Sequence, residues 1–336
     1  MAALPAGAAT RAAEISVAAA NTDDPITERA NDIGIEGRAG DRLGHRFVRP
    51  VGSLRNLDGV AAGEGEPQDA PLRGVVGRAA STPLFDLDRW APSKSAGRFV
   101  EHFWSVDWDL RGREPHTNTV ITFPSLHLTH EWGSDTPRHG FALPNTLVHG
   151  VVDRVFRTTI SECGTVVGAR FRPGGFTARF GRDAAALTGR VVPVDADLFG
   201  APITLKDDNT SAAAGLDDAI AAGAGEMDST YTSLSALVER IRDDDRLHRV
   251  EQVMRLSPWS ARTTQRVFRR YVGVPVKWVL CRYRLQQAAL EIERDPDTDF
   301  ADLAVRLGWY DQAHFINDFR SMLGSTPGEY ADAHGS

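Results

Sequence analysis

Apolar and polar positions in the last ninety or so residues follow the period of an α-helix, in two similar units joined by one helix. The first unit reads HRVEQVMRLSPWSARTTQRVFRRYVG and ends at Gly273; the second reads DFADLAVRLGWYDQAHFINDFRSMLG and ends at Gly324. Each unit predicts a short helix, a turn and a longer helix with one apolar and one polar face. A helix-turn-helix of this kind lays its second helix in the major groove of DNA, so two units on one chain can address neighbouring groove turns without a dimer.

The longer helix of the first unit is predicted from about Ala261 to Tyr271. Ser260 suits its start, because a hydroxyl can accept an orphan backbone N–H, and Gly273 follows its end. At about 100° per residue, an apolar face for the core is formed by Thr264, Val267, Phe268 and Tyr271. The opposite face carries the candidate base and phosphate contacts Arg262, Gln265 and Arg266, with Arg269 and Arg270 expected on the DNA backbone. Arg pairs with guanine and Gln with adenine through two hydrogen bonds, and the alternative is a solvated basic face.

The second unit has the same outline and a weaker polar face. Gly308 is expected to end its short helix and Asp311 to cap the longer one. An apolar stripe is formed by Phe315, Ile316, Phe319 and Leu323. The candidate DNA contacts opposite it are Gln312, His314 and Asn317, beside Ala313. Because this face has no arginine and Asp318 at its edge would repel phosphate, a purely structural role is the alternative.

One helix, from about Val276 to Ile292, is predicted to connect the two units. Its seventeen residues span roughly 25 Å, and DNA repeats about every 34 Å, so a rod of this length can set two recognition helices near adjacent groove turns. Leu280, Tyr283, Ala288 and Cys281 are expected to pack inward, Cys281 as a buried thiol. The residues expected in the cores of the two units are Phe268, Leu285, Leu303, Phe315 and Phe319.

From about Trp90 the chain changes to short β-branched and aromatic runs separated by Gly, Pro, Asp or Asn. These runs are RFVEHFWSVDWDL, TVITFP, LHLTHEW, VFRTTI and TVVGARF. Their spacing predicts a small β-sandwich or barrel. The fold expected is therefore α+β with two domains. Its parts are a disordered extension (1–80), a β-rich sensor or dimerisation domain (83–205), a linker with a short helix (206–231) and an all-α double helix-turn-helix domain (232–333).

Bulk composition sets broad limits on the class of protein. The 336 residues are 42% hydrophobic and 25% charged, which is ordinary for a globular chain with room for two domains. No apolar run approaches the roughly 20 residues that span a bilayer, and the first residues are a poor secretion signal. Cys163 and Cys281 are the only cysteines. No disulfide framework follows from two distant cysteines, and a reducing cytoplasm is expected.

The net charge of −7 conceals a strongly uneven distribution. Residues 246–290 hold ten Arg or Lys against one acid, a net charge of +9. Residues 291–336 hold ten acids against three Arg, a net charge of −7. A basic segment of this kind is the electrostatic footprint of a nucleic-acid-binding surface. The first unit is therefore expected to bind phosphate strongly and the second weakly.

At these residues the chain resembles the AraC/XylS family of transcription regulators. The matching motifs are S-x-R-x-x-Q-R-x-F (260–268), G-V-P-V-K-W-V (273–279), R-L (284–285), D-L-A-x-x-L-G-W (302–309), D-Q-A-H-F-x-x-x-F (311–319) and G-S-T-P-G-E-Y (324–330). The resemblance implies two helix-turn-helix subdomains on a connecting helix. Thr264 departs from the usual core Leu of the family, and Ala331 stands where a basic residue often follows the aromatic.

A second, less specific resemblance covers the β-rich segment from Trp90 to about Gly200. It rests on H-F-W-S-V (102–106), V-G-A-R-F-R-P-G-G (167–175) and R-V-V-P-V-D (190–195), which are similar to the N-terminal region of one AraC-type subgroup. The resemblance implies a sensor or dimerisation module, often cupin-like.

The main alternative class is a cupin-like, metal-dependent enzyme. Its candidate ligands are His127, His130, Glu131, His139 and His149. Residues 127 and 130 of one strand point to opposite faces, which makes this a poor ligand set. Because no hydrolase, P-loop or metalloprotease motif is present either, no catalytic residue, metal or cofactor is expected. A protein-interaction module with a vestigial DNA-binding domain is the third class.

The function expected from the sequence is that of a cytoplasmic transcription regulator, either an activator or a repressor of its target genes. Its expected partners are promoter DNA, RNA polymerase, a small-molecule effector and a second copy of the chain, and no membrane.

Overall fold

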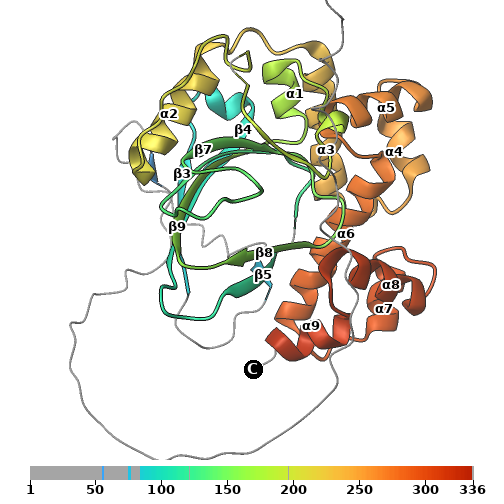
Figure 1. The fold of residues 1–336 in the computed structure, drawn as a ribbon. Coiled ribbons are helices and arrows are strands. Elements are labelled where there is room, and N and C mark those ends of the chain that lie inside the picture. Colours follow the sequence, from blue (N-terminus) through green and yellow to red (C-terminus); the bar gives the residue numbers. More distant parts are fainter. Residues whose placement is uncertain (1–54, 57–74, 77–83, 121, 196, 335–336) are drawn as a thin grey trace, which may run out of the picture. The chain divides into compact units, whose positions relative to one another are not determined.

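The structure of the protein is a computed structural model, which describes residues 55–56, 75–76, 84–120, 122–195 and 197–334. All of them fall within one compact unit, Pro50–Ser336. The predicted disordered extension, 1–80, lies outside the described residues except for two strands of two residues each. Figure 1 shows strands followed along the chain by helices, which confirms the α+β class with a β-rich part first and an all-α part last.

A seven-stranded sheet forms the frame of the β-rich domain. Its neighbouring strands are antiparallel, apart from the parallel pair β1–β3. In sheet order the strands are β1 (Arg55–Asn56), β3 (Asp86–Ala91), β4 (Val100–Asp109), β9 (Cys163–Phe171), β6 (His127–Trp132), β7 (Asn145–His149) and β10 (Val191–Pro193). The long apolar runs of the sequence thus lie at the centre of the sheet, as β4, β9 and β6.

A second sheet has three strands, in the order β2 (Val75–Val76), β5 (His116–Val120) and β8 (Phe156–Ile160). The run VFRTTI corresponds to β8, as predicted. Strands β3, β7 and β10 were not among the predicted runs. All three are short, and β3 and β7 mix polar with apolar residues, so pairing with neighbouring strands and not a pattern of their own makes them strands.

The two faces of the large sheet have different neighbours, because successive side chains of a strand point to opposite sides. On β4, Ser105 faces helix α2 (Asn209–Ala222), whose Asn209 Nδ2 donates to Ser105 Oγ at 3.3 Å. Trp104 points to the other face, where its indole Nε1 donates to His127 Nδ1 at 3.3 Å. That second face carries a cluster of polar side chains described below.

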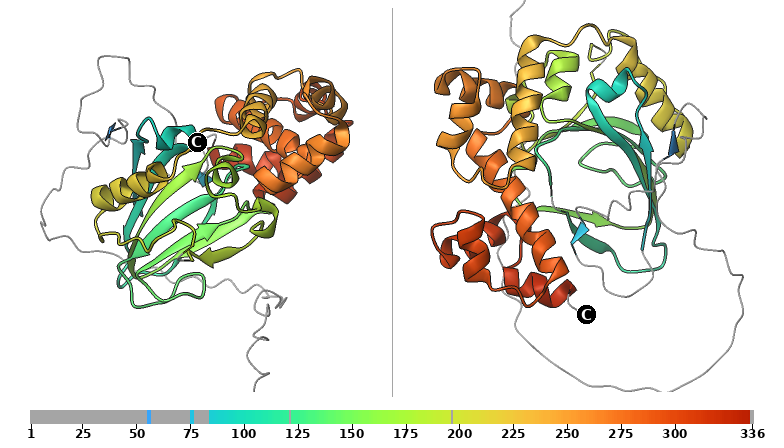
Figure 2. Two further views of the ribbon diagram at one scale, coloured as in Figure 1. Left: turned by 90° about the horizontal axis from the view of Figure 1, so that it is seen from above. Right: turned by 180° about the vertical axis from the view of Figure 1, so that it is seen from behind.

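Helix α2 occupies much of the segment that was predicted as a linker. Asp208 caps it by accepting from the backbone N–H of Ser211 at 2.8 Å. Figure 2 shows α2 lying against the large sheet. Its buried residues are Ala212, Ala213, Leu216, Asp217 and Ile220. The predicted short helix is therefore present, but it belongs to the core of the β-rich domain and does not act as a free linker.

Short helical segments in the described part of the chain connect the strands. They are η1 (Ala96–Arg98), α1 (Gly175–Phe180) and η2 (Ala184–Ala186). Of these, η1 packs against β4 and α2. The predicted turn at FRPGG precedes α1, where Gly174 has a φ of 86° and its missing side chain leaves room for Leu234 and Tyr231.

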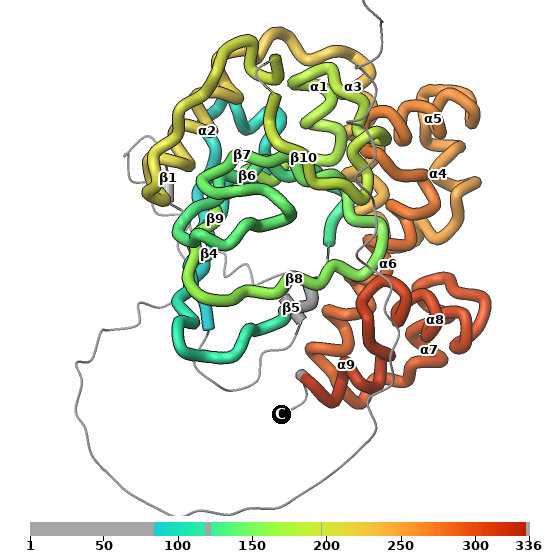
Figure 3. The backbone as a smooth tube through the Cα atoms, viewed as in Figure 1, coloured from blue at the N-terminus to red at the C-terminus, as the bar shows by residue number. Residues whose placement is uncertain are grey.

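The C-terminal helices follow the predicted double helix-turn-helix. The bounds are α3 (Ser229–Asp243), α4 (Val250–Leu256), α5 (Ala261–Val267) with the π-helical turn η3 (Phe268–Val272), α6 (Val276–Arg294), α7 (Phe300–Arg306), α8 (Gln312–Leu323) and α9 (Pro327–His334). Figure 3 shows α6 running from the pair α4 and α5 to the pair α7 and α8. Of the helices in the described residues, none is both long and apolar enough to cross a membrane.

Buried apolar residues form two main clusters that do not coincide with the two predicted domains. The larger one runs continuously from Trp90 and Phe103 of the sheet through α3 to Phe268 and Leu280. The second core unites α7, α8, α9 and the end of α6. The five predicted core residues, Phe268, Leu285, Leu303, Phe315 and Phe319, are all completely buried. The first helix-turn-helix unit therefore shares its core with the β-rich domain, and the second has a core of its own.

Candidate nucleic-acid interface

The start of α5 is fixed by a short network of hydroxyl groups. Ser260 Oγ accepts from the backbone N–H of Thr263 at 3.3 Å, which confirms the predicted N-cap. Thr264 is completely buried, and its hydroxyl donates to the Ser260 carbonyl at 3.0 Å and lies 2.7 Å from Ser257 Oγ. Threonine thus fills the position where the family usually has leucine, because the turn before α5 supplies partners for its hydroxyl.

The polar face of α5 lies on the surface of the protein. All five predicted contact residues of this unit are exposed, namely Arg262, Gln265, Arg266, Arg269 and Arg270. Val267 and Phe268 on the opposite face are buried. Within the described part of the chain, no acidic side chain forms an ion pair with any of these four arginines. Their guanidinium groups are therefore available to an external anion such as phosphate.

The recognition helix ends differently from the sequence prediction. A single α-helix was expected to reach Tyr271, but α5 ends at Val267 and continues as the wider turn η3. Gly273 closes it with a φ of 91°, as its predicted role as C-cap requires. The helical pattern of the sequence does not reveal such a turn, because one wider turn of five residues changes the apolar period too little to be noticed.

This end of the helix docks on the β-rich domain. The hydroxyl of Thr177 in α1 lies 3.2 Å from the carbonyl oxygens of Arg270 and Tyr271. The hydroxyl of Thr188 donates to the Gly273 carbonyl at 2.8 Å. The carbonyl groups that would otherwise be left unsatisfied at the end of the recognition helix are thus held by the other domain.

Two arginines counted in the basic segment do not belong to its surface. Arg282 is 1% exposed, donates to the Thr122 carbonyl at 2.6 Å, and donates to the Met322 carbonyl at 3.2 Å. Burial lowers the pKa of Arg282 to about 10. Arg284 is half-buried and its guanidinium lies 4.0 Å from the ring centre of Trp309. The net charge of +9 therefore overstates the charge that the first unit can present to DNA.

In the second unit the predicted caps are confirmed. Asp311 Oδ1 accepts from the backbone N–H of His314 at 2.7 Å, and Gly308 has a φ of 80° after α7. The predicted contact residues Gln312, His314 and Asn317 are exposed.

Asp318 has a different role from the one predicted for it at the outer edge of this face. Its Oδ2 accepts from the indole Nε1 of Trp309 at 2.8 Å and lies 3.6 Å from the Cys281 sulfur. Cys281 is half-buried and not fully buried as predicted, and burial, with the nearby Asp318 charge after it, raises the pKa of its thiol to about 12. Asp318 is thus a structural acceptor that ties α8 to Trp309 and α6.

The β-rich domain separates some of the histidines considered as metal ligands and unites others. His127 lies beside Trp104, while His130 points to the other face, where its Nε2 is 3.1 Å from Asp207 Oδ1. This confirms that residues 127 and 130 are not ligands of one site. The structure nevertheless brings Glu131, His139 and His149 together, and one ligand atom from each lies within 4.8 Å of the others. The expectation of a poor ligand set is wrong for these three residues.

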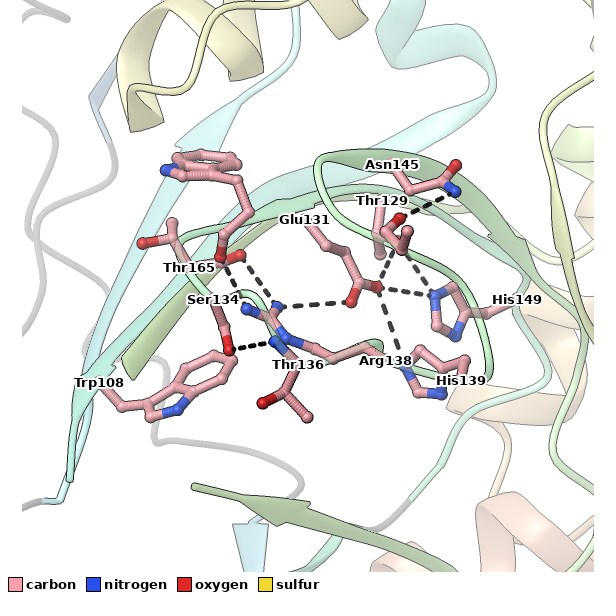
Figure 4. A network of polar contacts seen from close by, with 12 residues as sticks. Trp108, Thr129, Glu131, Ser134, Thr136, Arg138, His139, Asn145, His149 and Thr165 are labelled. Atoms are coloured by element: carbon pink, nitrogen blue, oxygen red, sulfur yellow. Dashed lines mark hydrogen bonds and ion pairs between the residues drawn. The ribbon is translucent and has the colours of Figure 1, made fainter. Parts of the chain in front are cut away.

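Figure 4 shows how the sheet and a hairpin position this polar cluster. Glu131 is on β6 and His149 on β7, and the hairpin between these strands supplies His139. Glu131 Oε1 lies 3.2 Å from His149 Nε2 and 3.9 Å from His139 Nε2. The sequence signal for Glu131 and His149 is the alternation of side chains along the two strands of the hairpin. Residues 127, 129 and 131 of β6 lie on the same face as residues 145, 147 and 149 of β7.

Electrostatics in this cluster lower the pKa values of both Glu131 and His139. Burial by itself would raise the pKa of Glu131, but the hydrogen bond and the charges from His149 and His139 bring it below its ordinary value. Burial lowers the pKa of His139, and the neighbouring His149 lowers it further. Glu131 is thus a carboxylate, and His139 has a free nitrogen lone pair, near neutral pH.

Comparison with known proteins matches two parts of the chain. Residues 257–333 match a family model described as a helix-turn-helix domain, and residues 88–193 match one described as a domain of unknown function, DUF6597. An uncharacterized HTH-type transcriptional regulator from Haemophilus influenzae is 26% identical over 99 residues. That similarity covers 30% of this chain, and the chain spans about a third, 32%, of the length of the relative.

Solved structures of ToxT from Vibrio cholerae are distantly similar. One, at 1.65 Å resolution, has a TM-score of 0.35 and 8% identity, and covers 76% of this chain and all of that one. Another, of wild-type ToxT bound to an unsaturated fatty acid, has a TM-score of 0.36 and 10% identity over 69% of this chain and 95% of that one. Because these structures are so distantly similar, the chain is assigned from its two matched domains and not from ToxT. The C-terminal part of this chain is an AraC-type helix-turn-helix domain, the kind of domain with which transcription regulators bind DNA.

Proposed function

We propose that this chain is a sequence-specific transcription regulator whose α5 and α8 enter adjacent major-groove turns of a promoter. The observation that carries the proposal is the polar face of α5 and η3, where Arg262, Gln265, Arg266 and Arg269 are exposed and the arginines have no acidic partner in the described residues. Three guanidinium groups and one amide on one face of about two helical turns suit base edges and phosphates better than they suit solvent alone.

The two units contribute unequally to this binding. In α5 Arg262, Gln265 and Arg266 contact bases or nearby phosphates, and Arg269 and Arg270 contact the backbone. In α8 the contacts come from Gln312, His314 and Asn317, which carry less positive charge. The first unit therefore supplies most of the affinity, and the second adds mainly sequence preference.

The β-rich domain, residues 83–205, binds the effector or a second copy of the chain in this proposal. Support comes from Arg170, which lies on the polar face of the large sheet with its guanidinium 3.6 Å from the ring centre of Phe123. Its Nη2 lies 3.2 Å from Glu101 Oε2, whereas its buried Nε has no hydrogen-bond partner among the described residues. A buried donor without a partner favours a ligand that brings an acceptor oxygen. Action at a promoter also places the protein in the cytoplasm with RNA polymerase as a partner.

The test is the affinity of the full chain for a DNA fragment selected on it from a random-sequence library, measured by fluorescence anisotropy. Arg266→Ala is expected to weaken binding by about 1–3 kcal/mol, or roughly 5- to 150-fold. The matched control is Arg306→Ala, because the Arg306 charge is already paired with Glu291 at 2.7 Å and Asp302 at 2.8 Å. Equal affinities for the wild type and Arg266→Ala would contradict the assigned face.

A further inference from the structure

The cluster of Glu131, His139 and His149 lies apart from the DNA-binding units, on the polar face of the large sheet. Two nitrogen ligands and one carboxylate oxygen converge there from three places on the hairpin that joins β6 to β7. Exposure increases in order across the three side chains, with 2% for Glu131, 15% for His149 and 29% for His139. The site is therefore closed at Glu131 and open to solvent at His139, where an ion can enter.

The separations between these atoms fit a small metal ion. Zinc binds imidazole nitrogen and carboxylate oxygen at about 2.0–2.2 Å, so two ligands on a tetrahedral ion lie about 3.3–3.6 Å apart. Glu131 Oε1 is 3.2 Å from His149 Nε2 and 3.9 Å from His139 Nε2. A shift of a few tenths of an ångström in the exposed His139 side chain would bring its Nε2 to the distance from Glu131 Oε1 that a tetrahedral ion requires, and the two histidine nitrogens already lie within 4.8 Å of each other.

A supporting shell already orients the carboxylate. The Thr129 hydroxyl donates to Glu131 Oε1 at 2.9 Å. Arg138 Nη1 lies 3.4 Å from the other oxygen, Oε2, and the guanidinium donates to the carbonyls of Thr165 at 3.1 Å and Trp132 at 2.7 Å. Such outer partners hold metal-binding carboxylates in one orientation and keep them ionised.

The backbone of His139 provides a second, independent sign of a built site. Its φ is 53°, one of two positive values among the non-glycine residues of the described chain. A non-glycine residue in this region is strained, and such strain gathers at ligand-binding positions, although histidine is among the residue types that tolerate it. The strained backbone lets the hairpin turn the His139 imidazole back toward Glu131 and His149.

We propose that Glu131, His139 and His149 bind one divalent transition-metal ion of the zinc type. Two imidazoles and one carboxylate suit zinc and other divalent first-row transition metals, whereas calcium and magnesium prefer sites built entirely from oxygen ligands. Three protein ligands leave a fourth position on the open side for water or an external ligand. The ion stabilises the β6–β7 hairpin of the β-rich domain.

The test measures metal binding by the full chain, freed of metal with a chelator and then supplied with zinc. Mass spectrometry of the metal content is expected to give one zinc per wild-type chain. His139→Asn is the sharpest variant, because asparagine also tolerates a positive φ but lacks the imidazole. We expect its zinc affinity to fall by more than about 100-fold, since loss of an outer partner alone costs about 10- to 100-fold. Glu131→Gln, which keeps the side-chain shape, is expected to behave in the same way.

Two controls separate metal binding from folding. His116→Asn, on β5 of the other sheet, is expected to keep the wild-type affinity. Cobalt in place of zinc is expected to give the visible absorption of a tetrahedral ion in the wild type and in His116→Asn, and none in His139→Asn. Far-ultraviolet circular dichroism of His139→Asn without metal should match that of the wild type. A wild-type chain that retains no zinc after gel filtration, or a His139→Asn variant that binds zinc as tightly as the wild type, would overturn the proposal. None of these measurements involves DNA.

Discussion

Single titratable side chains with shifted pKa values make the stability of this protein depend on pH. His102 is half-buried on β4 of the β-rich domain, and burial, with the charges of Arg170 and Arg89 after it, lowers its pKa to about 3. An unfolded histidine has a pKa of about 6.5. His102 is therefore neutral in the folded protein, and protonation favours the unfolded chain. Its contribution to stability is complete above about pH 6.5 and is lost as the pH falls.

Replacement of His102 by Gln is therefore expected to flatten the acid dependence of unfolding. Linkage with these two pKa values assigns a loss of about 2 kcal/mol to His102 between pH 7 and pH 5. The check is urea unfolding at both pH values, with His314→Gln as the control because His314 is exposed. If the wild type and His102→Gln lose the same stability over this interval, His102 is not held neutral.

Single residues were predictable where their partners lie within one helical turn. Ser260 and Asp311 cap helices as their sequence positions predict, because a cap binds an N–H only three residues away. Glu131 and its two histidines were not predictable in this way, since strand register decides which residues of a hairpin face each other. That register pairs His127 directly with His149, and it can be read only when the alternation of both strands is aligned across the hairpin.

At the scale of elements, α2 shows how composition can mislead. Its sequence is rich in Ala and lies in a segment predicted as a linker with a short helix, yet Ala212, Leu216 and Ile220 recur at intervals of four residues and are all completely buried. One narrow apolar stripe is enough to stabilise a helix when that stripe packs against a sheet. The sequence predicted the helix but not its place in the core.

Leu216→Ala distinguishes the two roles of α2. If Leu216 is a core residue, the substitution is expected to lower the free energy of unfolding by about 2–5 kcal/mol. If α2 were a free linker, the same substitution would lower it by less than about 0.5 kcal/mol. Asp218→Ala, two residues along and exposed, is the matched control and should change stability little. Thermal or urea unfolding followed by tryptophan fluorescence measures both.

At the scale of the whole molecule, the two helix-turn-helix units differ in what supports them. The first is continuous with the core of the β-rich domain, and Thr188 and Thr177 hold the end of its recognition helix. The second has a separate core, and the buried Arg282 joins its Met322 carbonyl to Thr122 of the β-rich domain. Helical periodicity revealed both units but not this division, because a core shared between distant segments leaves no local pattern.

Two phenylalanine truncations test this division. Phe319→Ala removes a completely buried ring from the second core and is expected to increase hydrogen exchange in α7, α8 and α9 only. Phe268→Ala removes one from the shared core and should increase exchange in β4 and β9 as well as in α5. Each is expected to cost about 3–5 kcal/mol in its own unit. Equal exchange patterns for the two variants would show a single undivided core.

The most direct test of the central claim, that the basic face of α5 binds DNA, is the salt dependence of binding by the full chain. Each phosphate neutralised contributes about −0.9 to the slope of log K against log salt concentration. The wild type is expected to give a steep negative slope, and a variant with Arg262, Arg266, Arg269 and Arg270 all changed to Ala should give a slope shallower by about two to four. A variant that retains the wild-type slope and affinity would contradict the claim.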